Sequence, residues 1–389
     1  MSYYNSNTLS FFEEKETPFY FYDLALLEET LKQLNEAVKG LPYHVHYAIK
    51  ANANPKVLKK IKQAGLGIDT VSGNEILCAL EHGFKGEQIA FAGVGKSDKE
   101  IAIGLEHDIF TFNVESLEEL KVLDQMAKGA NKMAKIAIRL NPNINAKTHH
   151  YITTGLEENK FGINYWELAQ LFELLHQLEH IELKGLHFHI GSQIRDLGVF
   201  KNLCNRVNEL QAEFKERNIE LEHINVGGGL GVNYQDPDQE IIPDFKSFFE
   251  VFENFIDLLP TQQLHFELGR ALVAQCASLI SRVLFIKKGI KTNFAILDAG
   301  MTELIRPALY QSFHKIENLS QMERKANQRY DVVGPICESS DCFGKAILLP
   351  ESKRGDLFAI RSAGAYGEVM SSSYNLREKA EIYYDPEVG

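Results

Sequence analysis

The sequence lacks an excess of basic residues. Its 389 residues carry a formal charge of −12 at pH 7, and no lysine-rich or arginine-rich run interrupts that balance. Proteins that bind a nucleic-acid backbone concentrate Lys and Arg, so this composition argues against a nucleic-acid partner. A hydrophobic content of 44% and a charged content of 24% are ordinary for a globular protein, and the length suits one large domain with a smaller one.

Long apolar runs and paired cysteines are missing as well. No apolar run approaches the roughly 18 residues of a membrane span. The segment MSYYNSNTLSFFEEKETPF has neither the cationic start nor the apolar stretch of a signal peptide. We therefore expect a cytoplasmic protein without a membrane partner. The five cysteines are scattered and form no CxxC pair, which predicts reduced thiols without a disulfide framework or structural zinc.

Short apolar segments recur along the first part of the chain, and helix-length segments separate them. Residues 74–84 and 115–127, for example, have apolar residues at three- and four-residue spacing, with Ser72 and Ser116 placed to open helices. This alternation predicts a parallel sheet, and eight strands predict a closed (β/α)8 TIM barrel of the α/β class, with an open doubly wound sheet as the alternative. The expected strands lie in YHVHYAIK, GLGIDTV, IAFAG, IFTFNV, KIAIRLNP, LKGLHFHIGS, EHINVGGGLG and QLHFELGR.

The pattern changes after Arg270. Strand-like segments follow one another there without long helices between them, which predicts a C-terminal antiparallel β domain. The N-terminal segment TPFYFYD also has the pattern of a strand, and we expect it to join the same sheet. The expected domains are a barrel over residues 24–275 and a β-sandwich-like or β-barrel-like domain formed by residues 1–23 and 276–389. The expected strands after Arg270 lie in VAQCASLISRVLFIKKG, NFAILDAG, YDVVGPICE, GKAILLP and DLFAIRSAG.

The C-terminal ends of the barrel strands are where a (β/α)8 barrel carries its reactive groups. Lys50 closes the first strand on the same face as His44, His46 and Ala48, the face expected to point inward. An ordinary surface lysine is the alternative for Lys50. The strand ends together predict one functional site made of Lys50, Ser72, Gly93, Glu115, Arg139, Asn141, His189, Ser192, Gly227–Gly231, Glu267 and Arg270.

The glycine run and two histidine pairs each allow two interpretations. Backbone amides of VGGGLG could cradle a phosphate, although glycine runs also form plain turns. A polar loop follows this run, which makes a dinucleotide-binding fingerprint unlikely. The pairs HVH and HFH could ligate a metal, but no further ligands accompany them as a set. Packed or stacked imidazoles are the favoured interpretation, and no metal is expected.

Cys337 lies in an unusually polar setting in the expected β domain. It is flanked by Pro335, Glu338 and Asp341 in GPICESSD. A lone cysteine is usually an inert apolar side chain, and this polar neighbourhood favours a functional role instead.

Seven ordered motifs resemble those of the diaminopimelate decarboxylases, and the resemblance runs from about residue 18 to about residue 378. These enzymes use pyridoxal 5'-phosphate (PLP) and pair an alanine-racemase-like barrel with a β domain. The resemblance implies decarboxylation of meso-2,6-diaminopimelate to L-lysine and CO2, the last step of lysine biosynthesis. The motifs are AIKANANP, HFHIGSQ, NVGGGLG, FELGR, LIRPALY, GPICESSD and SAGAYGEVMSSSYN.

The resemblance also implies roles for individual residues. Lys50 holds PLP covalently through its amine, and Glu267 pairs with the pyridine nitrogen of PLP. Cys337 returns a proton to the carbon that CO2 leaves. The other implied cofactor contacts are His189 on the ring and Ser192, Gly227, Gly228, Gly229, Gly269, Arg270 and Tyr366 around the phosphate.

Substrate choice follows from charge under the same resemblance. Arg270 and Arg306 bind the distal carboxylate of diaminopimelate with planar, charged donors, and Tyr310 and Tyr366 add hydroxyl groups. Glu338 meets the distal ammonium group, where ornithine-type relatives usually have aspartate. The segment ITTGLEENKFGI resembles the loop that covers the active site of diaminopimelate enzymes.

Family members place the Cys-Glu pair of CESSD across a dimer interface. We therefore expect a homodimer in which Cys337 and Glu338 complete the neighbouring subunit's site. The alternatives are a decarboxylase of the same fold that acts on ornithine, arginine or carboxynorspermidine, a non-catalytic PLP-binding protein, and a metal-dependent hydrolase. Arg306 and Glu338 argue against the first alternative, and the joint presence of Lys50, Cys337 and Glu338 argues against the second.

Overall fold

The computed structural model describes residues 3–144 and 160–385. The chain divides into two compact units, which we call the barrel unit and the sheet unit. The domain limits expected from the sequence stay a prediction. The barrel unit contains Leu31–Gly231 and Asp244–Gly269, and the sheet unit contains Met1–Thr30, Val232–Pro243 and Arg270–Gly389.

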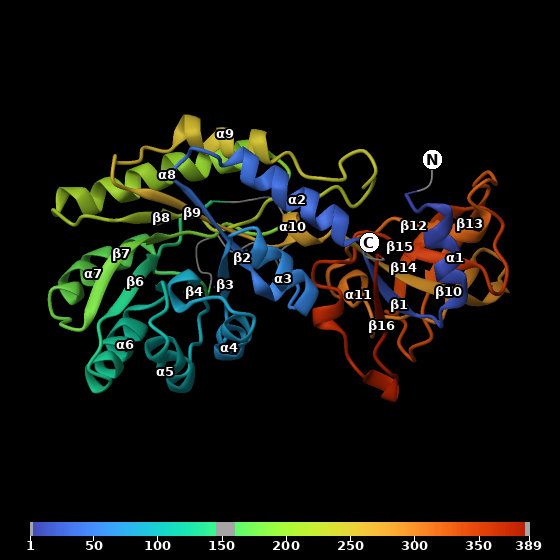
Figure 1. Cartoon of the computed structure of the whole chain (residues 1–389), viewed down its shortest axis with the longest axis horizontal. Helices are drawn as coiled ribbons and strands as arrows, with labels where there is room; N and C mark the ends of the chain where they lie inside the picture. Colours follow the sequence, from blue (N-terminus) through green and yellow to red (C-terminus); the bar gives the residue numbers. More distant parts are fainter. Residues whose placement is uncertain (1–2, 145–159, 386–389) are drawn as a thin grey trace. The chain divides into compact units, whose positions relative to one another are not determined.

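The barrel unit is built on a closed ring of eight parallel strands (Figure 1). The ring closes because β2 pairs with both β3 and β9, so that Tyr47 lies opposite Ile68 on one side and Leu268 on the other. All eight segments expected from the sequence contribute a strand, which confirms the closed barrel over the open sheet. The strands are β2 (Tyr43–Ala48), β3 (Gly67–Thr70), β4 (Ile89–Phe91), β5 (Thr111–Val114), β6 (Ala134–Arg139), β7 (Ile181–His187), β8 (His223–Asn225) and β9 (Gln263–Leu268).

Amphipathic helices separate the barrel strands along the chain, one more precedes the first strand, and Figure 1 shows them outside the ring. The side chains of Ser72 and Ser116 accept hydrogen bonds from the amides of Glu75 (3.2 Å) and Glu119 (3.1 Å), so both serines cap helices as expected. The helices are α2 (Leu24–Ala37), α3 (Pro55–Gln63), α4 (Gly73–Glu81), α5 (Asp98–Glu106), α6 (Leu117–Gly129), α7 (Leu168–Leu175), α8 (Leu197–Glu216) and α9 (Phe245–Phe255). In the described part of the chain, no helix has the length and apolar character needed to cross a membrane.

The sheet unit contains an eight-stranded sheet that includes the N-terminal strand. As expected, β1 joins this sheet, with Phe19 opposite Ile280 of β10. The sheet is mixed rather than purely antiparallel, because β1 runs parallel to β16 and β11 runs parallel to β13. Two short strands, β12 and β16, were not predicted from the sequence. The strands are β1 (Phe19–Tyr22), β10 (Ala277–Lys288), β11 (Asn293–Leu297), β12 (Ile316–Asn318), β13 (Gln328–Val333), β14 (Cys342–Leu349), β15 (Leu357–Ile360) and β16 (Glu381–Tyr384).

Three short helices complete the sheet unit. Helix α1 places Phe12 in an aromatic cluster with Phe19 and Phe21 of β1, and all three rings are buried. Close aromatic packing of this kind explains why an N-terminal segment is held in a sheet whose other strands come from the C-terminal part of the chain. The helices are α1 (Ser6–Glu14), α10 (Arg270–Val273) and α11 (Arg306–Tyr310).

A packed histidine cluster lies at the N-terminal ends of the barrel strands. His46 Nε2 is 2.8 Å from His265 Nδ1, and the rings of His44 and Phe110 stack on His265. His223 packs against His265 with a ring-centroid distance of 4.9 Å. The HVH pair therefore packs as stacked imidazoles, at the end of the barrel opposite to Lys50.

Burial keeps these imidazoles neutral. Desolvation lowers the pKa of His46 to about 4 despite the favourable charge of Glu267, and it lowers the pKa of His223 to about 3 together with the neighbouring His46, His187 and Lys184. The same cause lowers the pKa of His265 well below its ordinary value. Protonating this cluster would place charge inside the barrel wall.

We expect acid to destabilise the barrel through this cluster. An unfolded histidine takes up a proton near pH 6.5, whereas the folded His46 and His223 stay neutral down to about pH 4 and about pH 3. Their contribution to stability is therefore complete above pH 6.5. It falls by about 1.4 kcal/mol per pH unit for each histidine as the pH drops toward these values. Urea denaturation between pH 7.5 and pH 4.5 measures this slope.

The variant His223→Gln should lower the slope of the unfolding free energy against pH by the amount that corresponds to about one proton. His176 is exposed, so His176→Gln is the matched control and should leave the slope unchanged. Equal slopes for His223→Gln and the unmodified protein would contradict the assignment.

Candidate functional site

Lys50 lies just beyond the end of β2, in a single 3₁₀ turn at Ile49–Ala51. Its Nζ is 2.8 Å from Oδ2 of Asp69, a fully buried residue of β3. Burial and the charge of Glu267 raise the pKa of Asp69, and the Lys50 ammonium opposes them. Lys50 is thus held by an acid inside the barrel, which argues against an ordinary surface lysine.

Glu267 lies on β9 with three hydrogen-bond donors around its carboxylate. The side-chain amides of Asn113 and Asn225 donate to Oε1 over 3.1 Å and 2.9 Å, and His187 Nε2 is 3.0 Å from Oε2. Burial favours the neutral acid, but the charges of His187 and Lys50 outweigh it and hold the pKa of Glu267 below its ordinary value. The structure therefore keeps a negative charge at this position in the barrel interior.

The sequence analysis missed four residues of this network as site residues: Asp69, Asn113, His187 and Asn225. Each is a polar residue that is buried within a barrel strand. Buried polar groups need partners, so a polar residue at a strand position facing the interior was the available signal. It did not identify the partner, because the four strands are far apart in the sequence.

His189 and the glycine run meet at the ends of β7 and β8. The amide of Gly228 donates to Nδ1 of His189 over 3.3 Å, which places the proton of a neutral imidazole on Nε2. Burial lowers the pKa of His189 to about 3, assisted by the charges of Arg139 and Lys50. The ring is therefore neutral and has a defined tautomer.

The glycines allow the chain to pass close to its neighbours. A Cβ atom on Gly228 would lie 2.0 Å from the carbonyl oxygen of Glu267, so a side chain there would displace β9. Gly227 and Gly229 have positive φ angles of 70° and 112°, a conformation that L side chains rarely adopt. The amides of Gly227 and Gly228 donate to Asn225 Oδ1 over 2.9 Å and to His189 Nδ1 over 3.3 Å, so the run is fastened to the ends of β8 and β7.

The loop that carries Ser192 runs beside the glycine run. The amide of Ile194 donates to the carbonyl of Gly229 over 2.8 Å, and the amide of Gly231 donates back to Ile194 over 2.9 Å. Gly269, directly after β9, packs against the start of the Lys50 turn, where its Cβ would lie 3.1 Å from Cβ of Ala48. The barrel thus brings together Ser192, the glycine run, Gly269 and Lys50 at one end of its strands.

The remaining strand-end residues of the barrel bond to one another and to nearby backbone. Arg139 Nη1 is 2.7 Å from Oε1 of Glu115, which also accepts from the amide of Gly93 over 2.8 Å. Asn141 Oδ1 accepts from the amide of Asn143 over 3.0 Å, a local turn contact. These residues brace the loops around the site. The expected covering loop, ITTGLEENKFGI, lies mostly outside the described residues.

The sheet unit holds a second cluster, centred on Tyr234. Its hydroxyl accepts a hydrogen bond from Arg270 Nη1 over 2.8 Å, and the guanidinium of Arg306 lies 4.7 Å from its ring centroid. Arg270 also lies 4.9 Å from the ring centroid of Tyr366. Burial raises the pKa of Tyr234, but the charges of Arg270 and Arg306 outweigh it, so this pKa lies below its ordinary value. The sequence analysis did not single out Tyr234, which follows the glycine run in a polar loop.

Arg306 is a buried cation without an acidic partner. Its side chain is 4% exposed, and no carboxylate of residues 3–144 or 160–385 forms an ion pair with it. Burial lowers its pKa, and the charge of Arg270 acts in the same direction. Tyr310 follows one helical turn later in α11 and acts electrostatically on Arg270. Arg270 and Arg306 both contact Tyr234, and two guanidinium groups around one side chain favour the binding of an anion.

Cys337 and Glu338 are exposed at the surface of the sheet unit. The hydroxyl of Tyr374 donates to Glu338 Oε1 over 2.8 Å, and the amide of Cys337 donates to Asn375 Oδ1 over 3.2 Å. Leu376, which directly follows Asn375, is 96% exposed, and Val369 is 44% exposed. The pair is thus held on a surface that also displays apolar side chains.

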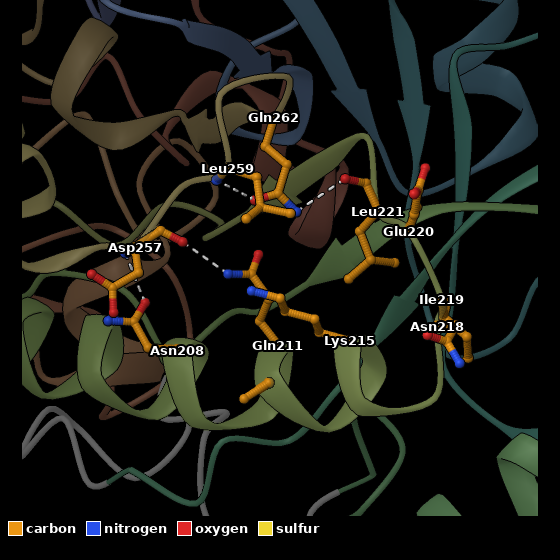
Figure 2. A pocket seen from close by; sticks show the side chains of 11 residues that line it. Asn208, Gln211, Lys215, Asn218, Ile219, Glu220, Leu221, Asp257, Leu259 and Gln262 are labelled. Carbon is orange, nitrogen blue, oxygen red and sulfur yellow. Dashed lines mark hydrogen bonds between the residues drawn. The ribbon is translucent and has the colours of Figure 1, made fainter.

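A cavity of about 400 Å³ is lined by none of these residues (Figure 2). It is formed by the C-terminal half of α8 and by the loops that lead into β8 and β9, at the N-terminal end of the strands. Its polar groups largely satisfy one another: Gln211 Nε2 donates to the carbonyl of Asp257 over 2.8 Å, and Gln262 Nε2 donates to that of Leu221 over 3.0 Å. Barrels carry their chemistry at the other end, so this cavity is not the candidate site.

The barrel residues fit PLP. A carboxylate offers about four acceptor positions, and Glu267 uses three, which leaves one for a pyridinium N–H. Buried polar atoms of the same network, Asp69 Oδ1, Asn113 Oδ1 and His187 Nδ1, have no protein partner among the described residues. A polar ring supplies partners of the kind that they need, and a glycine run allows the backbone to approach a phosphate closely.

The comparisons with known sequences agree with this fit. The family described as pyridoxal-dependent decarboxylase, pyridoxal binding domain, matches residues 24–274. The diaminopimelate decarboxylase of Bacteroides thetaiotaomicron is 56% identical over 378 residues, which is 97% of each chain. That of Vibrio cholerae is 41% identical and covers 95% of this chain and 88% of the relative.

Solved structures resemble the whole chain. The diaminopimelate decarboxylase from Helicobacter pylori, solved with L-lysine, has a TM-score of 0.91 and 38% identity, over 98% of this chain and 94% of that one. The lysine/ornithine decarboxylase from Vibrio vulnificus, solved with putrescine, has a TM-score of 0.85 and 20% identity, over 100% and 99% of the two chains. At that identity the second likeness concerns the fold alone.

Proposed function

Since the chain belongs to the pyridoxal-dependent decarboxylase family, we propose that it decarboxylates meso-2,6-diaminopimelate to L-lysine and CO2, with PLP as its cofactor. The enzyme is a carboxy-lyase, and this reaction completes lysine biosynthesis. The substrate assignment draws on the curated relatives that act on diaminopimelate and on the solved relative that holds L-lysine.

The observation that carries the substrate assignment is the buried Arg306. Burying a guanidinium without an acidic partner costs free energy, and a bound anion offsets that cost. Diaminopimelate keeps one carboxylate after the other leaves as CO2, and that distal group fits Arg306 and Arg270. Ornithine and arginine have no carboxylate at the distal end, so neither offers this pairing. Tyr310 and Tyr366 add hydroxyl groups beside the two arginines.

The residues of the barrel hold the cofactor and set its charge. When bound, PLP withdraws the electron pair that CO2 leaves behind. Lys50 attaches the cofactor through the amine that Asp69 orients, and Glu267 keeps the pyridine nitrogen protonated. Neutral His189 packs on the ring. Ser192, the backbone of Gly227–Gly229 and the amide of Gly269 would hold the phosphate.

Proton return and recognition of the distal amine are assigned to Cys337 and Glu338. The thiol of Cys337 donates the proton to the carbon from which CO2 departed, and the carboxylate of Glu338 meets the distal ammonium group. Both side chains are exposed, and apolar Val369 and Leu376 are exposed with them. Such a surface suits a second copy of the chain, so the proposal includes a homodimer whose subunits complete each other's sites.

Complementation tests the shared site directly. Lys50→Ala and Cys337→Ala subunits should each be inactive alone, and mixing them should restore up to about a quarter of the activity, through the one intact site of each heterodimer, since random exchange makes half of the dimers heterodimers. Sedimentation over a dilution series gives the subunit state. Activity in a dilution-stable monomer contradicts the shared site.

A panel of substrates tests the reaction. CO2 release is measured from the PLP-loaded enzyme with meso-diaminopimelate, LL-diaminopimelate, lysine, ornithine and arginine. Release from the meso compound alone, with L-lysine as product, is the expected result. Release from ornithine or arginine instead would keep the decarboxylase and overturn the role of Arg306, and release from none would favour a non-catalytic PLP carrier.

Cellular location is the last part of the proposal. A pathway enzyme that uses a small soluble substrate belongs in the cytoplasm, and the acidic composition suits that compartment. Cell fractionation with an antibody against the chain tests this location, and recovery with the envelope fraction would contradict it.

A further inference from the structure

His314 lies beside Arg306 in the sheet unit and has no role so far. Its ring is 1% exposed. Nε2 is 2.8 Å from Arg306 Nη1, and Nδ1 is 2.9 Å from the carbonyl oxygen of Arg361. The ring also packs edge-on against Tyr234, with a centroid distance of 5.0 Å. One imidazole thus links the backbone, Arg306 and Tyr234.

The two hydrogen bonds fix the protonation state of His314. The carbonyl of Arg361 only accepts, so Nδ1 must carry the proton. The guanidinium of Arg306 only donates, so Nε2 must present a lone pair. A doubly protonated ring would direct an N–H toward a cation at 2.8 Å. Burial and the charges of Arg306 and Arg270 accordingly lower the pKa of His314 well below its ordinary value.

The neutral ring leaves the charge of Arg306 uncompensated. A carboxylate in the place of His314 would neutralise the guanidinium and compete with a bound anion. An imidazole acceptor instead fixes one N–H of Arg306 while the full positive charge remains for a ligand. The ring of Tyr234 limits the guanidinium on another side. The guanidinium is therefore oriented without being neutralised.

We propose that His314 is a positioning residue that orients Arg306 toward the distal carboxylate of the substrate. This role rests on the proposed function, because it assigns the carboxylate of diaminopimelate to Arg306. His314 itself does not touch the substrate. Its contribution is to hold the guanidinium in a defined rotamer before substrate binds, which lowers the ordering that binding requires.

Two variants separate the two hydrogen bonds. His314→Gln can place its carboxamide oxygen near the position of Nε2 and keep an acceptor for Arg306. His314→Asn can keep a donor near the position of Nδ1 but leaves Arg306 without its acceptor. His314→Phe keeps the ring volume without an acceptor and replaces His314→Asn if that variant does not fold. Thermal unfolding and PLP absorbance identify the folded, cofactor-loaded variants.

The measurements are KM and kcat for meso-diaminopimelate and the inhibition constants of L-lysine and cadaverine. L-lysine retains the carboxylate assigned to Arg306, and cadaverine has none. In His314→Asn we expect KM and the inhibition constant of L-lysine to rise by up to about tenfold, the cost of ordering one long side chain when the ligand binds. The inhibition constant of cadaverine and kcat should change less than about twofold, and His314→Gln should restore most of the loss.

Each other outcome overturns the role. Equal rises for L-lysine and cadaverine would show general damage to the site, and unchanged constants in His314→Asn would show that Arg306 needs no such support. Either of these two outcomes is measured against an unmodified enzyme that decarboxylates diaminopimelate, so neither contradicts the proposed function. An unmodified, PLP-loaded enzyme that releases no CO2 from diaminopimelate overturns the proposed function and the role of His314 together.

Discussion

Lys50→Ala is expected to lower the rate of CO2 release from meso-diaminopimelate by at least about a thousandfold and to remove the visible absorbance of bound PLP. The side chain of Lys50 is the amine that attaches the cofactor and exchanges with the amine of the substrate, and alanine offers neither function. Asp69, 2.8 Å from Nζ, orients that amine and would be left as a buried acid without its ion-pair partner. Single-turnover kinetics and an absorbance spectrum of the PLP-loaded protein measure the two effects.

Lys59 provides the matched control, because it is exposed on α3, a few residues farther along the chain. Lys59→Ala should keep the full rate and the full spectrum. A Lys50→Ala protein that turns over at a rate near that of the control would disprove the assignment of Lys50. Loss of folding would appear in thermal unfolding and would separate a structural effect from a chemical one.

Glu267→Gln is expected to produce the second largest loss, about a hundredfold or more in kcat. Glutamine nearly preserves shape but removes the negative charge that keeps the pyridine nitrogen of PLP protonated. Because the pKa of Glu267 lies below its ordinary value, the carboxylate stays charged across the neutral range, and the loss should be the same from pH 6 to pH 8. Steady-state kinetics across this range measure kcat.

Glu267→Asp separates charge from position. It keeps the carboxylate but shortens the side chain, so the hydrogen bonds from Asn113 and Asn225 lengthen. We expect Glu267→Asp to retain more activity than Glu267→Gln, because charge at the ring nitrogen is the larger effect. The reverse order, with glutamine the more active, would mean that hydrogen-bond geometry rather than charge governs the role of Glu267.

The barrel was predictable from the sequence because its signal is local. Each strand is a short apolar segment, and each is followed by a segment with helical spacing, so the eightfold alternation is visible without any knowledge of contacts. Capping serines such as Ser72 and Ser116 mark the helix starts. The short strands β12 and β16 carried no comparable pattern, since their pairing depends on partners far away in the chain.

The roles of single residues show the same division between local sequence patterns and tertiary contacts. Lys50, Glu267 and Arg306 stand in recognisable motifs, and their positions at the ends of elements could be read from the sequence. Asp69 and His314 lie outside the recognised motifs, and Asn225 begins the motif NVGGGLG without a predicted role. Only their distances to Lys50, Glu267 and Arg306 reveal what they do. A hydrogen-bond partner is defined by three-dimensional position, which local composition does not encode.

The sequence by itself determined the alternation of strands and helices, the motif residues and the family, because each depends on residues close together in the chain. Tertiary structure alone decided which charges and protonation states those residues have. The depressed pKa of Glu267 arises from groups on other strands, the neutral state of His314 arises from Arg306 and a carbonyl, and the raised pKa of Asp69 arises from burial. Electrostatic effects depend on distance and desolvation, and both exist only once the chain has folded.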